Sequence, residues 1–183
     1  MTLNTIKTTI GYYLTLLRKY CSFSLDKNTF EDVFNYLRIR DNLATSGQPT
    51  KSQFSSIRDQ GFKTVINLAP NSAENALKDE QATLMDLGIN YIHIPVDFKN
   101  PTEADFNMFV DKMQALTDEK VWVHCAANMR VSAFIYENEL YYPLAEGGMS
   151  QTKIDLNING FYCLEDDIAQ YKKNAISEYK KRF

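Results

Sequence analysis

One short segment of the chain carries the residue types needed for nucleophilic chemistry. An apolar run from Val121 ends in His124 and Cys125, and Arg130 follows shortly after. A thiol between a buried strand and a helix start lies among backbone N–H groups. Such N–H groups, together with a nearby guanidinium, favour the thiolate and attract oxyanions. The segment therefore predicts a cysteine nucleophile, Cys125, in an anion-binding loop.

The residues between the cysteine and the arginine suit a loop whose backbone faces an anion. They are Ala126, Ala127, Asn128 and Met129. The two alanines leave the loop free of bulk, and asparagine is among the non-glycine residues best able to adopt a positive φ. Arg130 can bind two oxygens of one anion. A lone cysteine at a strand end is usually core filler, but this combination favours a functional site.

The two histidines of the chain are expected to differ in role. His124, beside the cysteine, is expected to hold the loop backbone by hydrogen bonds and to favour the thiolate. His93 alternates with Ile92 and Ile94, which is typical of an ordinary buried or half-buried histidine. The three cysteines lack zinc-ligand spacing. We therefore expect neither a metal nor a cofactor.

The chain around this segment repeats a short β-rich run, turn residues and a helical stretch. This rhythm predicts βα units and an α/β fold, with a central, mostly parallel sheet of four or five strands flanked by helices. The strand candidates are residues 43–46, 63–68, 90–96 and 121–124. Ligands of open parallel sheets bind beyond the carboxyl ends of the strands. Cys125 falls at such an end.

Capping residues and helical periodicity predict the helices between these strands. Thr50 with Gln53 forms a capping box. Further helices are predicted over residues 72–87, after Thr102 and from near Met129.

Length and composition favour one domain. The 183 residues are 44% hydrophobic and 13% aromatic, enough for a real core. We assign residues 1–183 to a single domain, with residues 1–40 as an N-terminal helical extension and 41–143 as the core. Residues 144–183 form an irregular connection and a C-terminal helix.

The net charge and the number of cysteines indicate which partners and which cellular compartment to expect. A net charge of −3 argues against nucleic acid, because its binders usually carry a basic footprint. An odd number of cysteines without a disulfide framework indicates a reduced, cytoplasmic protein. The N-terminal apolar run at 10–17 is interrupted by Gly11 and Thr15, so neither a signal peptide nor a membrane span is predicted.

Four segments together resemble a known family. They are LATSGQPT at 43–50, GFKTVINLAP at 61–70, GINYIHIPVDF at 88–98 and VHCAANMRVSAF at 123–134. The last is similar to the phosphate-binding loop of cysteine-dependent tyrosine and dual-specificity phosphatases. The whole stretch looks most like the phosphatase-like domain of beta-lactamase-hydrolase-like proteins. The resemblance implies a phosphotyrosine-phosphatase-like fold and hydrolysis of phosphomonoesters, on protein phosphotyrosine or a small phosphorylated molecule.

The resemblance also implies roles for individual residues. Cys125 would attack phosphorus and form a phosphocysteine, while the loop amides and Arg130 stabilise the phosphate oxygens. Asp97, in IPVDFKNPT, would protonate the leaving group. Asp105 is the reserve acid, although its place in a helix first turn has a sufficient structural explanation. The implied partner is a phosphorylated substrate or a bound phosphate or sulfate.

The loop departs from the usual phosphatase pattern, which has five residues between cysteine and arginine rather than four. One residue fewer removes one N–H and about 3.3–3.6 Å of chain. Val131 stands where a hydroxyl residue would directly follow the arginine, although Ser132 keeps the usual offset from Cys125. A loop of this length resembles that of rhodanese-like sulfurtransferases, whose cysteine carries a persulfide. A non-catalytic anion- or phosphoprotein-binding pseudophosphatase is the third alternative.

Overall fold

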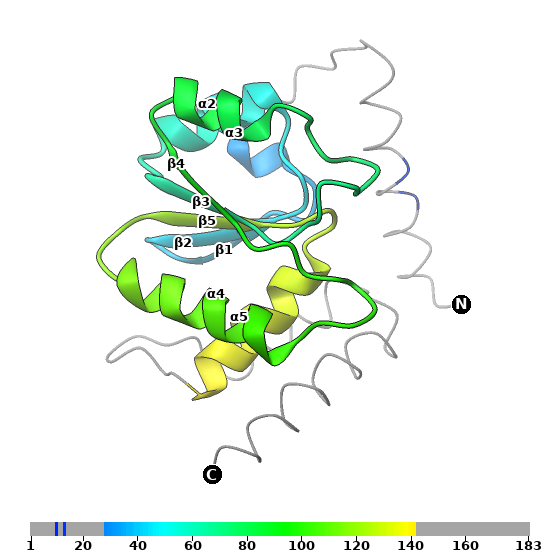
Figure 1. Cartoon of the computed structure of the whole chain (residues 1–183). Helices are drawn as coiled ribbons and strands as arrows, with labels where there is room; N and C mark the ends of the chain where they lie inside the picture. Colours follow the sequence, from blue (N-terminus) through cyan, green and yellow to red (C-terminus); the bar gives the residue numbers. More distant parts are fainter. Residues whose placement is uncertain (1–9, 11–12, 14–27, 142–183) are drawn as a thin grey trace.

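The computed structural model of the chain describes Ile10, Tyr13 and residues 28–141. These residues form a sheet with helices on both faces (Figure 1). The terminal helices and the irregular connection expected from the sequence lie outside the described residues. The division of 1–183 as a single domain stays a prediction.

The sheet has five strands, in the order β1-β2-β5-β3-β4. Only β1 is antiparallel to its neighbour, and the other pairs are parallel. The bounds are β1 Leu37–Arg40, β2 Leu43–Ser46, β3 Thr64–Asn67, β4 Asn90–His93 and β5 Val121–His124. The predicted α/β fold with a mostly parallel sheet is confirmed.

The helices form two layers. They are the short 3-10 helix η1 Phe30–Asp32, α2 Lys51–Asp59, α3 Glu80–Asp86, α4 Glu103–Ala115 and α5 Met129–Tyr141. Helices α2 and α3 cover one face of the sheet, and α4 and α5 cover the other (Figure 1). The predicted capping box of Thr50 and Gln53 is confirmed, and Thr102 forms a second one with Asp105.

Two local predictions were wrong. Residues 1–40 were assigned to a helical extension, but Leu37–Arg40 form the edge strand β1, whose four residues are too short to show a clear alternation. The helix predicted over 72–87 begins only at Glu80. Before it, the chain makes turns such as Ala73 N–H to the Pro70 carbonyl, and Asn75 bonds a distant loop instead of continuing a helix.

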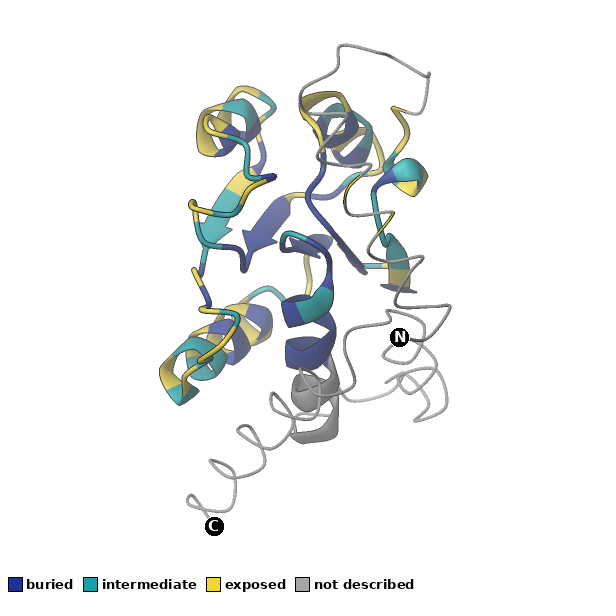
Figure 2. Ribbon diagram, turned by 90° about the vertical axis from the view of Figure 1, so that its right-hand side faces the viewer, coloured by how far each residue is buried: buried dark blue, intermediate teal, exposed yellow. Residues whose placement is uncertain are grey.

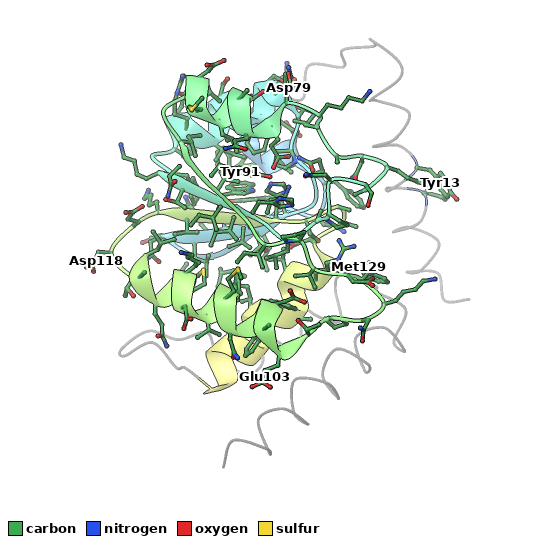
Figure 3. All side chains as sticks on the ribbon, in the orientation of Figure 1. Tyr13, Asp79, Tyr91, Glu103, Asp118 and Met129 are labelled. Atoms are coloured by element: carbon green, nitrogen blue, oxygen red, sulfur yellow. The ribbon has the colours of Figure 1, made fainter. Side chains whose placement is uncertain are left out.

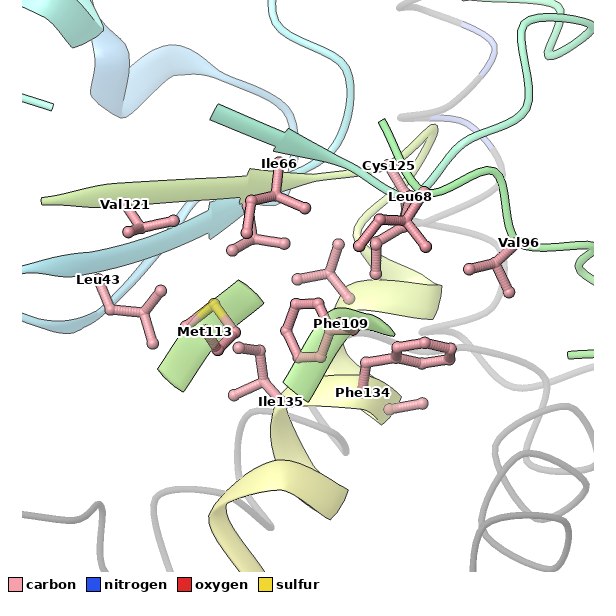
Figure 4. Close-up of a cluster of buried hydrophobic side chains, with 14 of the residues drawn as sticks. Leu43, Ile66, Leu68, Val96, Phe109, Met113, Val121, Cys125, Phe134 and Ile135 are labelled. Carbon is pink, nitrogen blue, oxygen red and sulfur yellow. The ribbon is translucent and has the colours of Figure 1, made fainter. Parts of the chain in front are cut away.

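The buried side chains divide into two apolar clusters, one on each face of the sheet. Because side chains alternate along a strand, Val121 and Val123 of β5 join the cluster under α4 and α5 (Figure 4). Trp122 joins the cluster under α2 and α3. His124 follows the same alternation, and its ring lies 5.9 Å from that of Phe54 in α2. The burial pattern of both layers is visible in Figure 2.

Strand β5 ends at a topological switch point. Its last residue, His124, is level with Ser46 of β2 and Asn67 of β3. The chain leaves β2 and β3 toward α2 and α3, but leaves β5 toward α5 on the opposite face (Figure 1). Open parallel sheets bind ligands at such points. The fold therefore indicates a ligand site at the residues just after His124.

The core predicts a clear contrast in stability. Ile66 is fully buried in β3, so Ile66→Ala should lower the free energy of unfolding by about 2–5 kcal/mol in chemical denaturation. Met85 is 71% exposed, so Met85→Ala should change it by less than about 0.5 kcal/mol. Equal losses in the two variants would contradict this description of the core.

Candidate active site

Cys125 lies where the sequence predicted, between the end of β5 and the start of α5 at Met129. Its backbone N–H donates to the carbonyl of Ser46 at 3.3 Å, which extends the pairing with β2 by one residue. The cysteine is 1% exposed and lies close to Leu68 in the core (Figure 4). It is the free cysteine of the described part of the chain.

Asn128 sets the conformation of the loop that follows. Its φ is 68°, so the expected positive φ is confirmed. The side-chain amide donates to the carbonyl of Asn35 at 2.8 Å and to the hydroxyl of Thr45 at 3.0 Å. The carbonyl of Asn128 accepts from the hydroxyl of Ser132 at 2.8 Å. These bonds anchor the loop to both the sheet and the first turn of α5.

The carbonyls of Ala126 and Ala127 accept hydrogen bonds from residues elsewhere in the chain. The Ala126 carbonyl accepts from Asn75 Nδ2 at 2.8 Å and from the backbone N–H of Gln48 at 3.3 Å. The Ala127 carbonyl accepts from Asn35 Nδ2 at 2.9 Å. An oxyanion-binding loop needs its carbonyls turned away from the anion, and these contacts give each carbonyl another partner.

Gly47 allows the loop to lie this close to β2. A Cβ placed on Gly47 would lie 3.0 Å from both the ring and the carbonyl of Phe34, and 3.1 Å from the carbonyl of Ala126. Any side chain here would therefore push the cysteine loop away from the sheet edge. The close packing of the loop against β2 therefore explains why a glycine occupies position 47.

Arg130 is positioned to receive an anion. It is 8% exposed in the first turn of α5, and its Nε has no hydrogen-bond partner among the described residues. Its guanidinium lies 5.2 Å from the ring centroid of Phe98. Burying a charge is costly unless the charge is paired, so a bound oxyanion would give this guanidinium a partner. Met129, just before it, is labelled at the helix start in Figure 3.

The two candidate acids differ in placement. Asp97 is exposed on the loop after β4, where its carboxylate accepts from the N–H of Lys99 at 2.9 Å. Phe98, the next residue, contacts Arg130, so this loop reaches the cysteine site. Asp105 is engaged in the capping box of α4. Asp97 is therefore the candidate whose loop contacts Arg130.

His124 contacts a buried carboxylate rather than the loop backbone. Its Nε2 lies 3.1 Å from Oε1 of Glu80, and both side chains are almost fully buried. The expected hydrogen bonds to the loop are absent among the described residues, because the alternation of β5 turns the ring toward α3. Burial alone raises the pKa of Glu80, but its neighbours, His124 foremost, outweigh this and hold the pKa below its ordinary value.

Sequence reasoning missed several residues that support the site. They are Asn35, Asn75 and Glu80, together with the side chain of Gln48. Glu80 looks like an ordinary first-turn acid in the sequence, and asparagines in loops carry no signal of a distant partner. Of these four residues, only Gln48 lies in a segment that the sequence had already singled out, LATSGQPT at 43–50.

The described residues give no sign of a metal centre. No group of three or more histidine, cysteine, aspartate or glutamate side chains in this part of the chain could hold an ion. His93 is half-buried, and its Nε2 lies 2.7 Å from the carbonyl of Ala69. None of the helices in the same part is long and apolar enough to cross a membrane.

Residues 27–163 match the model of a family described as DSP-PTPase phosphatase fused to NAD+ kinase. A beta-lactamase hydrolase-like protein of Agrobacterium fabrum is 35% identical over 97 residues, which are 51% of this chain and 22% of that protein. The chain therefore spans about a fifth of the curated relatives that it matches.

Two solved structures share the fold. One, named a "Putative phosphatase (DUF442)" of Shewanella putrefaciens, is 28% identical, with a TM-score of 0.71 over 81% of this chain and 91% of that one. The other is TpbA of P. aeruginosa in complex with pTyr. It is 18% identical, with a TM-score of 0.60 over 78% of this chain and 83% of that chain. At that identity the likeness shows the fold alone.

The loop geometry predicts different costs for two substitutions of Asn128. Both Asn128→Gly and Asn128→Ala lose the same side-chain hydrogen bonds, but alanine at a φ of 68° costs roughly 1–2 kcal/mol more. Chemical denaturation should therefore rank the alanine variant below the glycine variant. Asn100→Ala, on an exposed loop, is the control and should match the unmodified protein. Equal stability of the two Asn128 variants would contradict the observed loop conformation.

Proposed function

Because the chain belongs to the family described as DSP-PTPase phosphatase fused to NAD+ kinase, we propose that it hydrolyses phosphomonoesters through a phosphocysteine at Cys125. The observation that carries the proposal is the loop itself. A cysteine at the end of the central strand is followed by a left-handed Asn128 and a buried Arg130 whose Nε has no partner among the described residues. These features support attack by a thiolate and the binding of a tetrahedral oxyanion, in a loop one residue shorter than the usual phosphatase pattern.

In the first step, the Cys125 thiolate attacks phosphorus as the bond to the leaving-group oxygen breaks. Arg130 and the loop N–H groups stabilise the charge that develops on the other oxygens. In the second step, water attacks the phosphocysteine, releases inorganic phosphate and restores the thiolate. Ser132, whose hydroxyl donates to the Asn128 carbonyl, holds the loop through both steps.

Asp97 is proposed as the general acid that protonates the leaving oxygen. Its carboxylate is exposed, and its loop reaches the site through the contact of Phe98 with Arg130. The bond from the Lys99 N–H orients the carboxylate without burying it. In the second step the same carboxylate, now ionised, takes the proton from the attacking water.

The site and the relatives support two candidate classes of substrate. The loop after Cys125 and its Arg130 would bind the phosphate group of a substrate. The pTyr bound by TpbA makes protein phosphotyrosine one candidate. A small phosphorylated molecule is the other. A reducing compartment keeps a thiol nucleophile from being oxidised, so we propose a cytoplasmic location.

A rhodanese-like sulfurtransferase is a second candidate function, favoured by the short loop and by the 1% exposure of Cys125. The thiolate would take the sulfane sulfur of thiosulfate and release sulfite, which leaves a persulfide. Cyanide would then remove that sulfur as thiocyanate and restore the thiolate. The transferred sulfur is smaller than a phosphoryl group, so a four-residue loop has room for it. A pseudophosphatase that only binds oxyanions would complete neither cycle.

Two assays on the same protein separate these functions. We expect phosphate release from an aryl phosphate, abolished by Cys125→Ser, with Cys125 unmodified in the mass spectrum. Thiocyanate from thiosulfate and cyanide, with one extra sulfur on Cys125, would instead establish the sulfurtransferase. Isothermal titration calorimetry with phosphate and sulfate is the third measurement. Binding without turnover in either assay would indicate the pseudophosphatase, which only binds oxyanions.

Replacing the proposed acid tests the mechanism. Asp97→Asn should lower kcat on a phosphate ester with a poor leaving group by about 10²–10⁴-fold and leave KM nearly unchanged. The loss should shrink on an aryl phosphate whose leaving group needs little protonation. Asp105→Asn is the matched control and should affect stability through the capping box of α4 more than turnover. The same kcat in Asp97→Asn and in the unmodified enzyme would remove Asp97 from the mechanism.

A further inference from the structure

A buried carboxylate, that of Glu80, accepts hydrogen bonds from polar side chains at or just beyond the ends of three parallel strands. The first residue of α3, it is 5% exposed. Its Oε1 accepts from His124 Nε2 at 3.1 Å and from Asn67 Nδ2 at 2.9 Å, and its Oε2 accepts from Gln48 Nε2. The hydroxyl of Tyr91, labelled in Figure 3 between the sheet and α3, accepts from the same Asn67 Nδ2 at 3.2 Å.

Two of these partners connect Glu80 to the cysteine loop. His124 directly precedes Cys125 on β5. Gln48, on the other side, gives its backbone N–H to the carbonyl of Ala126, the residue after the cysteine. Glu80 is therefore linked to the residues on both sides of the nucleophile, although it does not belong to the loop.

We propose that Glu80 is a positioning residue for Cys125, which sets a carboxylate against the His124 ring behind the thiol and holds the loop through Gln48. The effect of Glu80 on turnover rests on the proposed function. Its effect on the reactivity of the Cys125 thiol does not depend on that function. A carboxylate in contact with an imidazole favours the protonated ring, and a positive charge beside a thiol favours the thiolate.

Hydrogen bonding alone does not require a charge at this position. A glutamine at residue 80 has the same shape, and its carbonyl could accept from His124 and Asn67. Its amide would need an acceptor, and Oε1 of Gln48 is buried with no partner among the described residues. A turn of the Gln48 amide would present that oxygen. Because burying a carboxylate costs several kcal/mol, the use of glutamate where glutamine fits points to the charge.

Glu80 is the charged side chain that contacts the His124 ring among the described residues. From α2, the ring meets the apolar Phe54. From β4, Tyr91 reaches the carboxylate, and burial together with the charge of Glu80 raises the pKa of this tyrosine, which keeps it neutral. From β3, Asn67 is neutral, and from β5 itself the neighbour is Cys125. Removal of the Glu80 charge therefore changes one defined electrostatic contact.

The test is the pH profile of Cys125 alkylation by iodoacetamide, followed by mass spectrometry of the peptide that contains it. Glu80→Gln should react about tenfold more slowly than the unmodified protein below pH 7, because the thiolate fraction falls. The two rates should converge at high pH, where both thiols are ionised. Asp86→Asn removes an exposed carboxylate from the same helix and should keep the unmodified profile.

The remaining outcomes decide against the proposal. A Glu80→Gln profile that superimposes on that of the unmodified protein overturns it, and a loss that is equal at every pH shows a purely structural role. If Glu80→Gln fails to fold by circular dichroism, His124→Asn removes the same contact between the ring and the carboxylate, and an unchanged profile there is equally decisive. Alkylation needs no substrate, so a protein without phosphatase activity would refute the proposed function but leave this test intact.

Discussion

The site depends on one constraint, which is that β5 must be hydrogen-bonded along both edges. Its parallel partners β2 and β3 end at the same level, with Ser46 and Asn67 beside His124. The polar residues that follow these ends therefore meet at a single place, and α3 adds a carboxylate to it. Parallel pairing in register is what converts residues far apart in the sequence into one cluster.

Local patterns predicted the parts of the site that are built locally. The apolar run before Cys125, the small loop and the helix start all lie within one short segment, and the residue type alone predicted the positive φ of Asn128. The support from distant residues could not be predicted in this way. Asn35 is 92 residues from Ala127, and Glu80 is 44 residues from His124. Only the sheet topology brings these pairs together.

The distribution of polar groups separates stability from function. Two apolar clusters, one on each face of the sheet, hold the strands together. The costly features lie at one edge: a buried guanidinium, a left-handed asparagine and a buried carboxylate. Such costs persist where surrounding packing fixes the structure, and they concentrate at functional sites. The loop that follows Cys125 lies at the same edge.

The clamp from Asn35 also sets the smallest piece of this chain that can hold the loop. Asn35 binds the Ala127 carbonyl through its side chain and the Asn128 amide through its backbone, and it lies before the edge strand β1. A fragment cut at residue 41, where the sequence pattern placed the start of the core, would keep Cys125 and Arg130 but lose both contacts with Asn35. The residues that support the site therefore begin earlier in the chain than the core that the sequence pattern predicted.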